Sequence, residues 1–167
     1  MTEADQLQWL FDRARITDVV NRFAMALDMR DWVLHRTCFA ETVTFDYPAS
    51  GGHRVLRADD LAKTSPPFFL WFDATQHIAA NHIIDIEGDE AVCVSTLHAQ
   101  HFRADANGGP LQKQIGLYRN RLLRDGDDWK IFHSAQFVRW SEGNQAMFDA
   151  ALTERQRQIG LMNETIS

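Results

Sequence analysis

The stretch Thr75–Ala91, TQHIAANHIIDIEGDEA, decides the fold and contains the histidine on which the functional hypothesis depends. Polar and apolar residues alternate from His77 to Ile86, which is the period of a β-strand, and Glu87-Gly88-Asp89 is typical of a hairpin turn. His77 lies at the start of this strand. We therefore expect a long strand that returns through a tight turn.

Three further strands are expected after this turn. The joints between them are short and rich in Gly and Asp, namely Asp105–Pro110 and Asp125-Gly126-Asp127. Short joints connect neighbouring antiparallel strands. The sequence therefore predicts a four-stranded antiparallel meander, with strands at about 76–86, 90–104, 111–124 and 128–140.

Helical patterns occupy the start of the chain. From Ala4 to about Asp28 the apolar residues recur every three or four positions without Gly or Pro, which predicts one long amphipathic helix. Asp31 can cap a short second helix, Trp32–Phe39. Asp28 then lies at the C-terminal end of a helix, where the helix dipole disfavours a carboxylate. We expect Asp28 to have another partner.

Shorter elements lie between these helices and the meander. Thr42–Tyr47 is rich in β-branched and aromatic residues, which predicts a strand. A short second strand is expected at Arg54–Leu56. A helix that begins near Arg57 cannot run through Pro66-Pro67. A last amphipathic helix is expected from Asn144 to about Ile159. Helices followed by a curled antiparallel sheet indicate one α+β domain over residues 1–167.

Composition excludes several classes of partner. The net charge is −6, and no block of Lys and Arg is present, which argues against nucleic acid or an anionic membrane. The acidic start, MTEADQ, is not a secretory signal, and no apolar run reaches membrane-spanning length. Cys38 and Cys93 are isolated, so we expect reduced thiols and a cytoplasmic location.

The histidines of the meander do not form a metal site by spacing. Side chains alternate across a strand, so His77 and His82 are expected on opposite faces, as are His98 and His101. His77 is expected to share its face with Asn81 and Ile83. No HExxH helix or Cys/His cluster supplies further ligands. We expect neither a metal nor a cofactor.

Taken in order, several segments resemble the SnoaL-like branch of the nuclear transport factor 2-like superfamily, and within it scytalone dehydratase and its relatives. Each segment is short, and together they span most of the chain. They are Ala26-Leu27-Asp28, Asp31-Trp32, Phe45-Asp46-Tyr47, Thr75-Gln76-His77, Gly88-Asp89-Glu90-Ala91, Asp128-Trp129-Lys130-Ile131 and Val138-Arg139-Trp140.

The resemblance implies a cone-shaped α+β barrel, in which N-terminal helices pack on a strongly curved antiparallel or mixed sheet that encloses a pocket. Enzymes of this family often share an Asp–His pair, which corresponds to Asp28 and His77. A tyrosine and a second histidine line the dehydratase site, and their positions match Tyr47 and His101.

The sequence departs from scytalone dehydratase at other positions. The tyrosine that precedes the helix-end aspartate is Leu27 here, and the Ser and Asn of the third long strand fall near Gly116 and Tyr118. The polar groups that hold that substrate are therefore absent. The acid–base pair is kept, whereas scytalone itself is not supported as substrate.

An imidazole exchanges protons near neutral pH when a carboxylate fixes its tautomer. We hypothesise that His77, oriented by Asp28, removes a proton, that Tyr47 polarises the developing oxyanion, and that His101 protonates a leaving hydroxyl. The outcome is dehydration or isomerisation of a small hydrophobic cyclic, polyketide- or steroid-like substrate. The expected substrate-binding residues are Asn81, Tyr118, Phe69 and Phe72.

Two further expectations concern other roles. The alternative function is a small-molecule-binding or assembly module without catalysis, including a role like that of a dioxygenase β subunit. The resemblance implies a homodimer or homotrimer, and we expect its contacts on the sheet face opposite His77, through Ile78, Ile84, Val92 and Val94. We expect no role for His35, His53 or His82, and a structural or interface role for Arg139.

Overall fold

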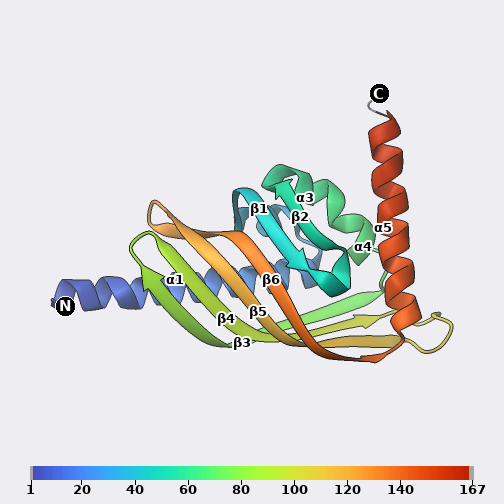
Figure 1. Ribbon diagram of the computed structural model, residues 1–167, viewed down its shortest axis with the longest axis horizontal. Coiled ribbons are helices and arrows are strands. Elements are labelled where there is room, and N and C mark those ends of the chain that lie inside the picture. Colours follow the sequence, from blue (N-terminus) through green and yellow to red (C-terminus); the bar gives the residue numbers. More distant parts are fainter. Residues whose placement is uncertain (1, 166–167) are drawn as a thin grey trace.

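Six strands form one curled sheet, and helices cover its concave side (Figure 1). The structure is a computed structural model that describes residues 2–165. The strand order is β2-β1-β6-β5-β4-β3, with β1 parallel to β6 and every other pair antiparallel. The elements are α1 (Glu3–Met29), α2 (Trp32–Thr37), β1 (Phe39–Tyr47), β2 (Gly52–Arg57), α3 (Ala58–Thr64), α4 (Pro66–Phe69), β3 (Ala74–Glu87), β4 (Glu90–Phe102), β5 (Leu111–Asp125), β6 (Asp128–Gly143) and α5 (Gln145–Thr165).

The α+β class and the curled mixed sheet that the sequence predicts are confirmed, although the sheet does not close into a barrel. The second helix is shorter than expected, whereas the expected break before Pro66-Pro67 is confirmed. The helix expected over Trp32–Phe39 ends at Thr37, because Phe39 begins β1. Pro66 and Pro67 start a new short helix, since the first turn of a helix tolerates residues without an amide hydrogen.

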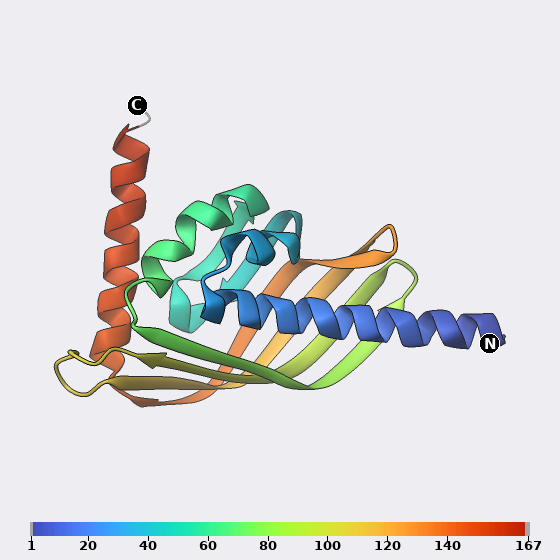
Figure 2. The same cartoon turned by 180° about the vertical axis from the view of Figure 1, so that it is seen from behind.

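Helix α1 packs across the concave face of the sheet, where it contacts β3 and β6 (Figure 2). Its inward stripe includes Ile16, Val19, Val20 and Phe23, none more than 5% exposed. These residues join side chains of the sheet in the main hydrophobic core. The first turns of α1 extend past the ends of the strands.

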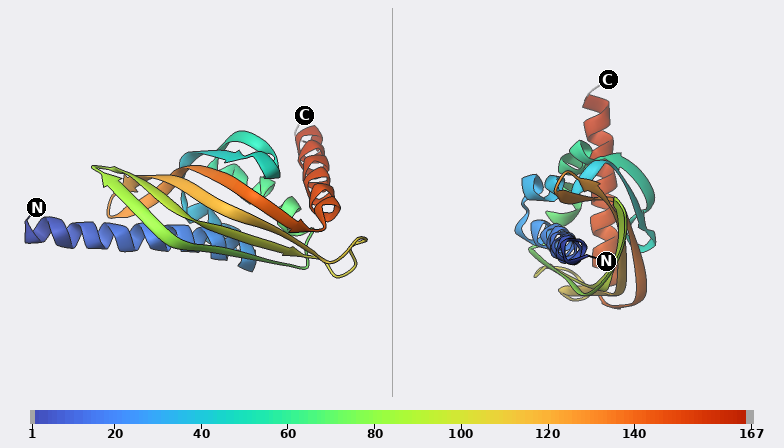
Figure 3. Two further views of the ribbon diagram at one scale, coloured as in Figure 1. Left: turned by 60° about the horizontal axis from the view of Figure 1, so that its bottom comes forward. Right: turned by 90° about the vertical axis from the view of Figure 1, so that its left-hand side faces the viewer.

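Helix α5 stands across the end of the sheet (Figure 3). The Asn144 side chain fixes its start, because its oxygen accepts a hydrogen bond from the Met147 amide at 3.1 Å. The Asn144 amide group donates to the carbonyls of Asn107 and Gly109 at 2.8 and 2.7 Å. The start of α5 is therefore bound to the β4–β5 loop, which directs the helix past α4.

A β-bulge in β3 corrects part of the sequence interpretation. Ala80 pairs with Thr96 and Ile83 with Val94, so β3 has one more residue than its partner in this interval. Asn81 takes a left-handed conformation with φ of 55°, which Asn tolerates better than most residues. The bulge shifts the alternation by one residue, so the prediction that Asn81 and Ile83 share the inner face with His77 is wrong.

Two other inferences from alternation fail at the same bulge. Ile84 is 6% exposed and belongs to the core, so it does not lie on the outer face as predicted. His82 follows the bulge and lies two residues before Ile84, so alternation places both on the inner face. The prediction that His82 and His77 lie on opposite faces therefore fails as well. On β4 the alternation is uninterrupted, and the face from Cys93 to His101 is the buried one.

Cys38 and Cys93 are both buried free thiols. Among the helices in residues 2–165, none is long and apolar enough to cross a membrane.

A buried ion pair holds α1 to the far end of the sheet. Asp12 is 3% exposed and accepts two hydrogen bonds from the Arg124 guanidinium, at 2.8 and 3.0 Å. The indole of Trp129 donates to the same carboxylate at 3.0 Å. The hydrogen bond from Arg124 is the main reason that the pKa of Asp12 is lowered to about 2.

Replacement Asp12→Ala is expected to lower the free energy of unfolding by about 2–4 kcal/mol, because it leaves a guanidinium and a buried indole N–H without their acceptor. Urea denaturation at pH 7 measures this loss. The matched control is Asp18→Ala, which removes an exposed carboxylate from the same helix. An equal effect of both substitutions would contradict the assigned role of Asp12.

Candidate active site

The C-terminal end of α1 places Asp28 against the start of β3. Its carboxylate accepts hydrogen bonds from the His77 backbone N–H at 2.7 Å, from the His77 ring Nδ1 at 2.7 Å and from the Thr75 hydroxyl at 3.0 Å. These donors compensate for the unfavourable end of the helix dipole. Asp28 therefore has the partners that its position in the sequence requires.

The same contacts determine the state of the His77 ring. An ionised carboxylate only accepts hydrogen bonds, so Nδ1 carries the proton that it donates to Asp28. Nε2 is then left with a free lone pair. The His77 side chain is 6% exposed and lines an internal pocket. A neutral imidazole with a free Nε2 can accept a proton from a bound molecule.

Arg30 supports this pair from behind. It has a left-handed conformation with φ of 59° at the C-cap of α1, and its guanidinium donates to Leu27 O at 2.8 Å and to the Thr75 hydroxyl at 2.7 Å. Because the Thr75 oxygen accepts from Arg30, its own proton is directed to Asp28. The chain Arg30–Thr75–Asp28–His77 fixes the imidazole on rigid elements.

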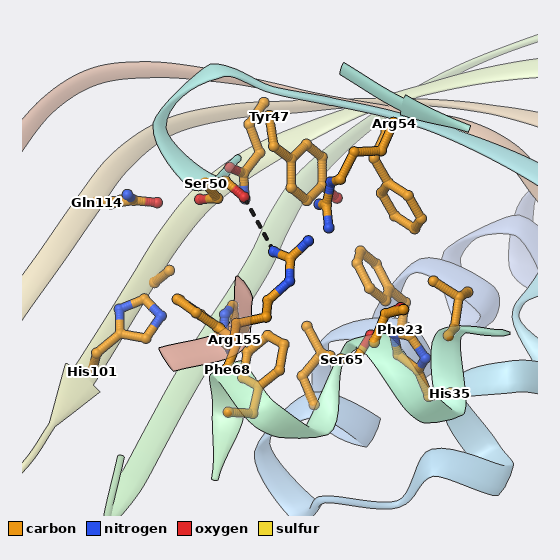
Figure 4. A pocket seen from close by; sticks show the side chains of 18 of the residues that line it. Phe23, His35, Tyr47, Ser50, Arg54, Ser65, Phe68, His101, Gln114 and Arg155 are labelled. Carbon is orange, nitrogen blue, oxygen red and sulfur yellow. Dashed lines mark hydrogen bonds between the residues drawn. The ribbon is translucent and has the colours of Figure 1, made fainter. Parts of the chain in front are cut away.

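The pocket lies between α1, the α3–α4 segment, the inner face of the sheet and α5 (Figure 4). Its cavity volume is about 70 Å³, several times the 10–15 Å³ or so that one water needs. The pocket therefore has room for a small organic molecule. Its apolar wall includes Phe23, Leu27, Phe45, Leu61, Phe68 and Phe69.

His101 lines the pocket beside His77, with 5.7 Å between ring centroids. It is 2% exposed, and its Nδ1 lies 3.1 Å from Gln112 Oε1. The Gln112 amide donates to a backbone carbonyl, so its oxygen accepts from His101 and Nε2 of His101 is left as an acceptor. Burial lowers the pKa of His101 to about 3, so this ring is neutral at pH 7.

Tyr47 and Tyr118 both line the pocket. The Tyr47 hydroxyl lies 2.7 Å from the Ser134 hydroxyl, and the Gln136 amide donates to the Tyr118 oxygen at 3.3 Å. The Tyr118 proton is therefore free to be donated into the pocket. Burial raises the pKa of both phenols, which keeps them protonated as donors.

The structure thus brings Asp28, His77, His101, Tyr47 and Tyr118 together, and adds Phe69, whose ring centroid is 5.8 Å from that of His77. Two expected residues lie elsewhere. Asn81 is exposed on the bulge of β3. Phe72 is buried behind His101, with ring centroids 4.8 Å apart, and supports the wall without lining it.

Several lining residues were not expected from the sequence: His35, Arg54, Gln114, Gln136 and Arg155. His35, for which no role was expected, is 2% exposed, and its pKa is lowered to about 4 by burial. One signal was present for Arg155. It follows Phe148 by seven positions and Ala151 by four, so a charged residue continues the apolar stripe of the last helix.

Within residues 2–165 no group of three or more His, Cys, Asp or Glu side chains is arranged to hold a metal ion. The site's own groups are those of proton-transfer chemistry.

Comparison with known proteins identifies the domain type. Residues 8–135 match the family model described as a SnoaL-like domain. Among curated proteins no significant match was found.

Solved structures agree in fold. A protein from Kribbella flavida is 23% identical, with a TM-score of 0.77 over 83% of this chain and 97% of its own. A protein from Novosphingobium aromaticivorans, provisionally named a scytalone dehydratase, is 20% identical, with a TM-score of 0.73 over 83% and 91%. A hexachlorocyclohexane dehydrochlorinase is 16% identical, with a TM-score of 0.69 over 83% and 93%.

The buried imidazoles predict a loss of stability in mild acid. The pKa values of His35 and His101 are about 4 and about 3 when folded, against 6.5 for an exposed imidazole. Between those values the unfolded chain binds protons that the folded one does not, so stability falls as pH drops below 6.5. From pH 7.5 to pH 5 each ring is expected to cost about 2 kcal/mol.

Urea denaturation of His35→Phe at these two pH values tests the prediction, since this variant should lose about 2 kcal/mol less than the wild type on acidification. At pH 5 the Asp12–Arg124 pair stays ionised, because the pKa of Asp12 is about 2. An identical loss in variant and wild type would exclude His35 as a source of the acid sensitivity.

Proposed function

The chain belongs to the SnoaL-like domain family, and on that premise we propose that it is a cofactor-independent lyase or isomerase in which His77, oriented by Asp28, removes a proton from a small substrate. The observation that carries the proposal is the 2.7 Å contact between Asp28 and Nδ1 of His77, whose side chain lines a largely apolar pocket. This arrangement matches a general base with its orienting carboxylate.

The first step breaks a C–H bond next to a carbonyl or similar activating group. The proton passes to His77 Nε2, and Asp28 stabilises the imidazolium that forms. Negative charge moves to the substrate oxygen, where the Tyr118 hydroxyl, and that of Tyr47 when Ser134 donates to it, can stabilise it by hydrogen bonds. Donors of this kind contribute a few kcal/mol in a site with little water.

The second step decides between the two reactions. If a hydroxyl lies on the neighbouring carbon, the C–O bond breaks, a C–C double bond forms, and the leaving oxygen takes a proton to become water. If the proton returns to another carbon, the product is an isomer. The wider resemblance to proteins named as dehydratases favours the elimination.

The surroundings of His101 modify the role proposed for it. A ring with a pKa of about 3 and an Nδ1–H engaged by Gln112 is a poor proton donor at pH 7. We propose instead that His101 Nε2 accepts a hydrogen bond from the substrate hydroxyl and orients it. The imidazolium of His77 then supplies the proton that leaves with water.

Turnover of a panel of cyclic β-hydroxy ketones, followed by the rise in enone absorbance, tests the proposal. Asp28→Asn is expected to reduce kcat by roughly 10²–10⁴-fold while ligand binding is retained, because the amide still fills the space but no longer fixes the tautomer. His77→Gln is expected to abolish turnover.

The matched control is His82→Gln, on the same strand and absent from the pocket lining. It is expected to turn over at the wild-type rate. Unchanged turnover in Asp28→Asn would contradict the proposed Asp28–His77 mechanism. Binding of the panel without any product in the wild type would instead favour a module that only binds small molecules.

A further inference from the structure

The pocket contains two arginines that the proposed chemistry does not use. Arg54, from β2, and Arg155, from α5, both line it, and their guanidinium groups point toward one another (Figure 4). Neither arginine takes part in the hydrogen bonds of the Asp28–His77 contact. In Figure 4, His101 lies on the other side of Arg155 from Arg54.

Neither guanidinium has a carboxylate partner among the described residues. Arg155 donates one long hydrogen bond to Ser50 O at 3.4 Å, and Arg54 lies over the Phe45 ring at 5.6 Å. The Nε atoms of both are buried without a hydrogen-bond partner in residues 2–165. Other arginines of the chain do pair with acids, namely Arg22, Arg36, Arg57, Arg103, Arg121, Arg124 and Arg157.

The two groups approach one point. A Cβ placed on Gly51 would lie 3.6 Å from Arg155 Nη1 and 4.0 Å from Arg54 Nε. Gly51 has φ of 109°, a conformation open to glycine. The turn between β1 and β2 therefore leaves open the space beside the two cations.

This arrangement is costly without a ligand. None of the described residues that line the pocket is acidic, although the whole chain has a net charge of −6. Burial lowers the pKa of Arg54, and burial together with repulsion from Arg54 lowers the pKa of Arg155 to about 10. Both remain charged at pH 7, so two partly desolvated cations face each other without compensation.

We propose that Arg54 and Arg155 form an oxyanion-binding subsite, and that the ligand is an apolar ring compound carrying a carboxylate or phosphate group. Guanidinium groups present paired N–H donors that match the oxygens of both anions. The phenylalanines of the wall receive the ring. As a statement about the substrate this rests on the proposed function, whereas the binding of the anion does not depend on catalysis.

Bound at this subsite, the anionic group would fix one end of the ligand. Orientation of a small apolar molecule in a smooth aromatic pocket requires a few polar anchors. With its acid group held by α5 and β2, the molecule presents its ring toward His77 and His101. The subsite thus selects acids over neutral analogues of the same shape.

Calorimetric titration with three probes tests the proposal: 2-naphthoate, phenyl phosphate and the neutral 2-naphthamide. The wild type should bind at least one of the two acids at least tenfold more tightly than the amide, a difference of about 1.4 kcal/mol. The tighter acid identifies carboxylate or phosphate as the preferred group. Inorganic phosphate alone should bind more weakly than phenyl phosphate, since it lacks the ring.

Arg54→Gln and Arg155→Gln should each weaken binding of the preferred acid at least tenfold and leave the amide unchanged. The matched control is Arg139→Gln, an exposed arginine outside the pocket, which should bind all probes as the wild type does. Equal affinity for acid and amide, no detectable binding of either acid, or unchanged acid binding in both pocket variants would overturn the proposal.

Thermal unfolding separates ligand binding from a structural role. Without ligand, both glutamine variants should melt at or above the wild-type temperature, because each removes one of two repelling, partly buried cations. The preferred acid should raise the wild-type melting temperature and not that of the variants. A failure of both variants to fold would assign the arginines to the fold and overturn the subsite.

Asp28→Asn should bind the acids as the wild type does, since Asp28 lies behind His77 and does not line the pocket. An inactive protein that still discriminates acid from amide would leave the subsite intact while the proposed catalysis fails. An active wild type that binds acid and amide equally would leave the proposed catalysis intact while the subsite fails.

Discussion

The contact between the end of α1 and the start of β3 is the constraint on which the rest of the site depends. A carboxylate at a helix C-terminus is electrostatically unfavourable, and Asp28 tolerates that position because β3 supplies a backbone N–H, a ring N–H and a hydroxyl. The same three donors fix helix to strand, carboxylate to imidazole, and imidazole to pocket. The stability of this helix end and the proposed proton transfer therefore depend on the same contact between α1 and β3.

The opposite end of α1 is held by a different device. The Asp12–Arg124 pair, with Trp129, lies far along the helix from the pocket. Its donors and acceptors bond to one another and not to a ligand. Its polar atoms are paired, whereas two polar atoms of the pocket lining, Gln114 Nε2 and Gln136 Oε1, are buried without partners among the described residues. Buried groups without partners reduce stability. Both glutamines line the pocket, where a bound ligand can pair with these atoms.

Strand periodicity and turn chemistry were sufficient to predict the meander, and the helix pattern to predict α1, because both are local properties of the chain. The assignment of β3 side chains to the two faces of the sheet failed at one residue. Asn81 occupies a bulge, and a single inserted residue exchanges the two faces for the remainder of β3. Nothing in the alternation of the sequence identifies the inserted residue, because apolar side chains occur on both faces. The errors at Ile83, Ile84 and His82 all follow from it.

The residues of the site also divide into those that the sequence predicted and those that it did not. Asp28, His77 and His101 could be named because the resemblance marks their positions. Arg54 and Arg155 belong to β2 and α5, which are remote in sequence and meet only in the folded chain.

In hindsight the signal for Arg155 was an inconsistency: a guanidinium at seven residues from Phe148 falls in the stripe that the helix buries. A charge in an apolar stripe costs free energy unless something pairs with it. Within the described chain nothing acidic does. The charge of Arg155 must then be compensated by solvent or by a ligand. Solvent is the less effective of these, because Arg54 lies nearby and repulsion between like charges grows as water is excluded. An anion relieves both costs at once, so the feature that weakens the empty fold is the one that gives the pocket its selectivity.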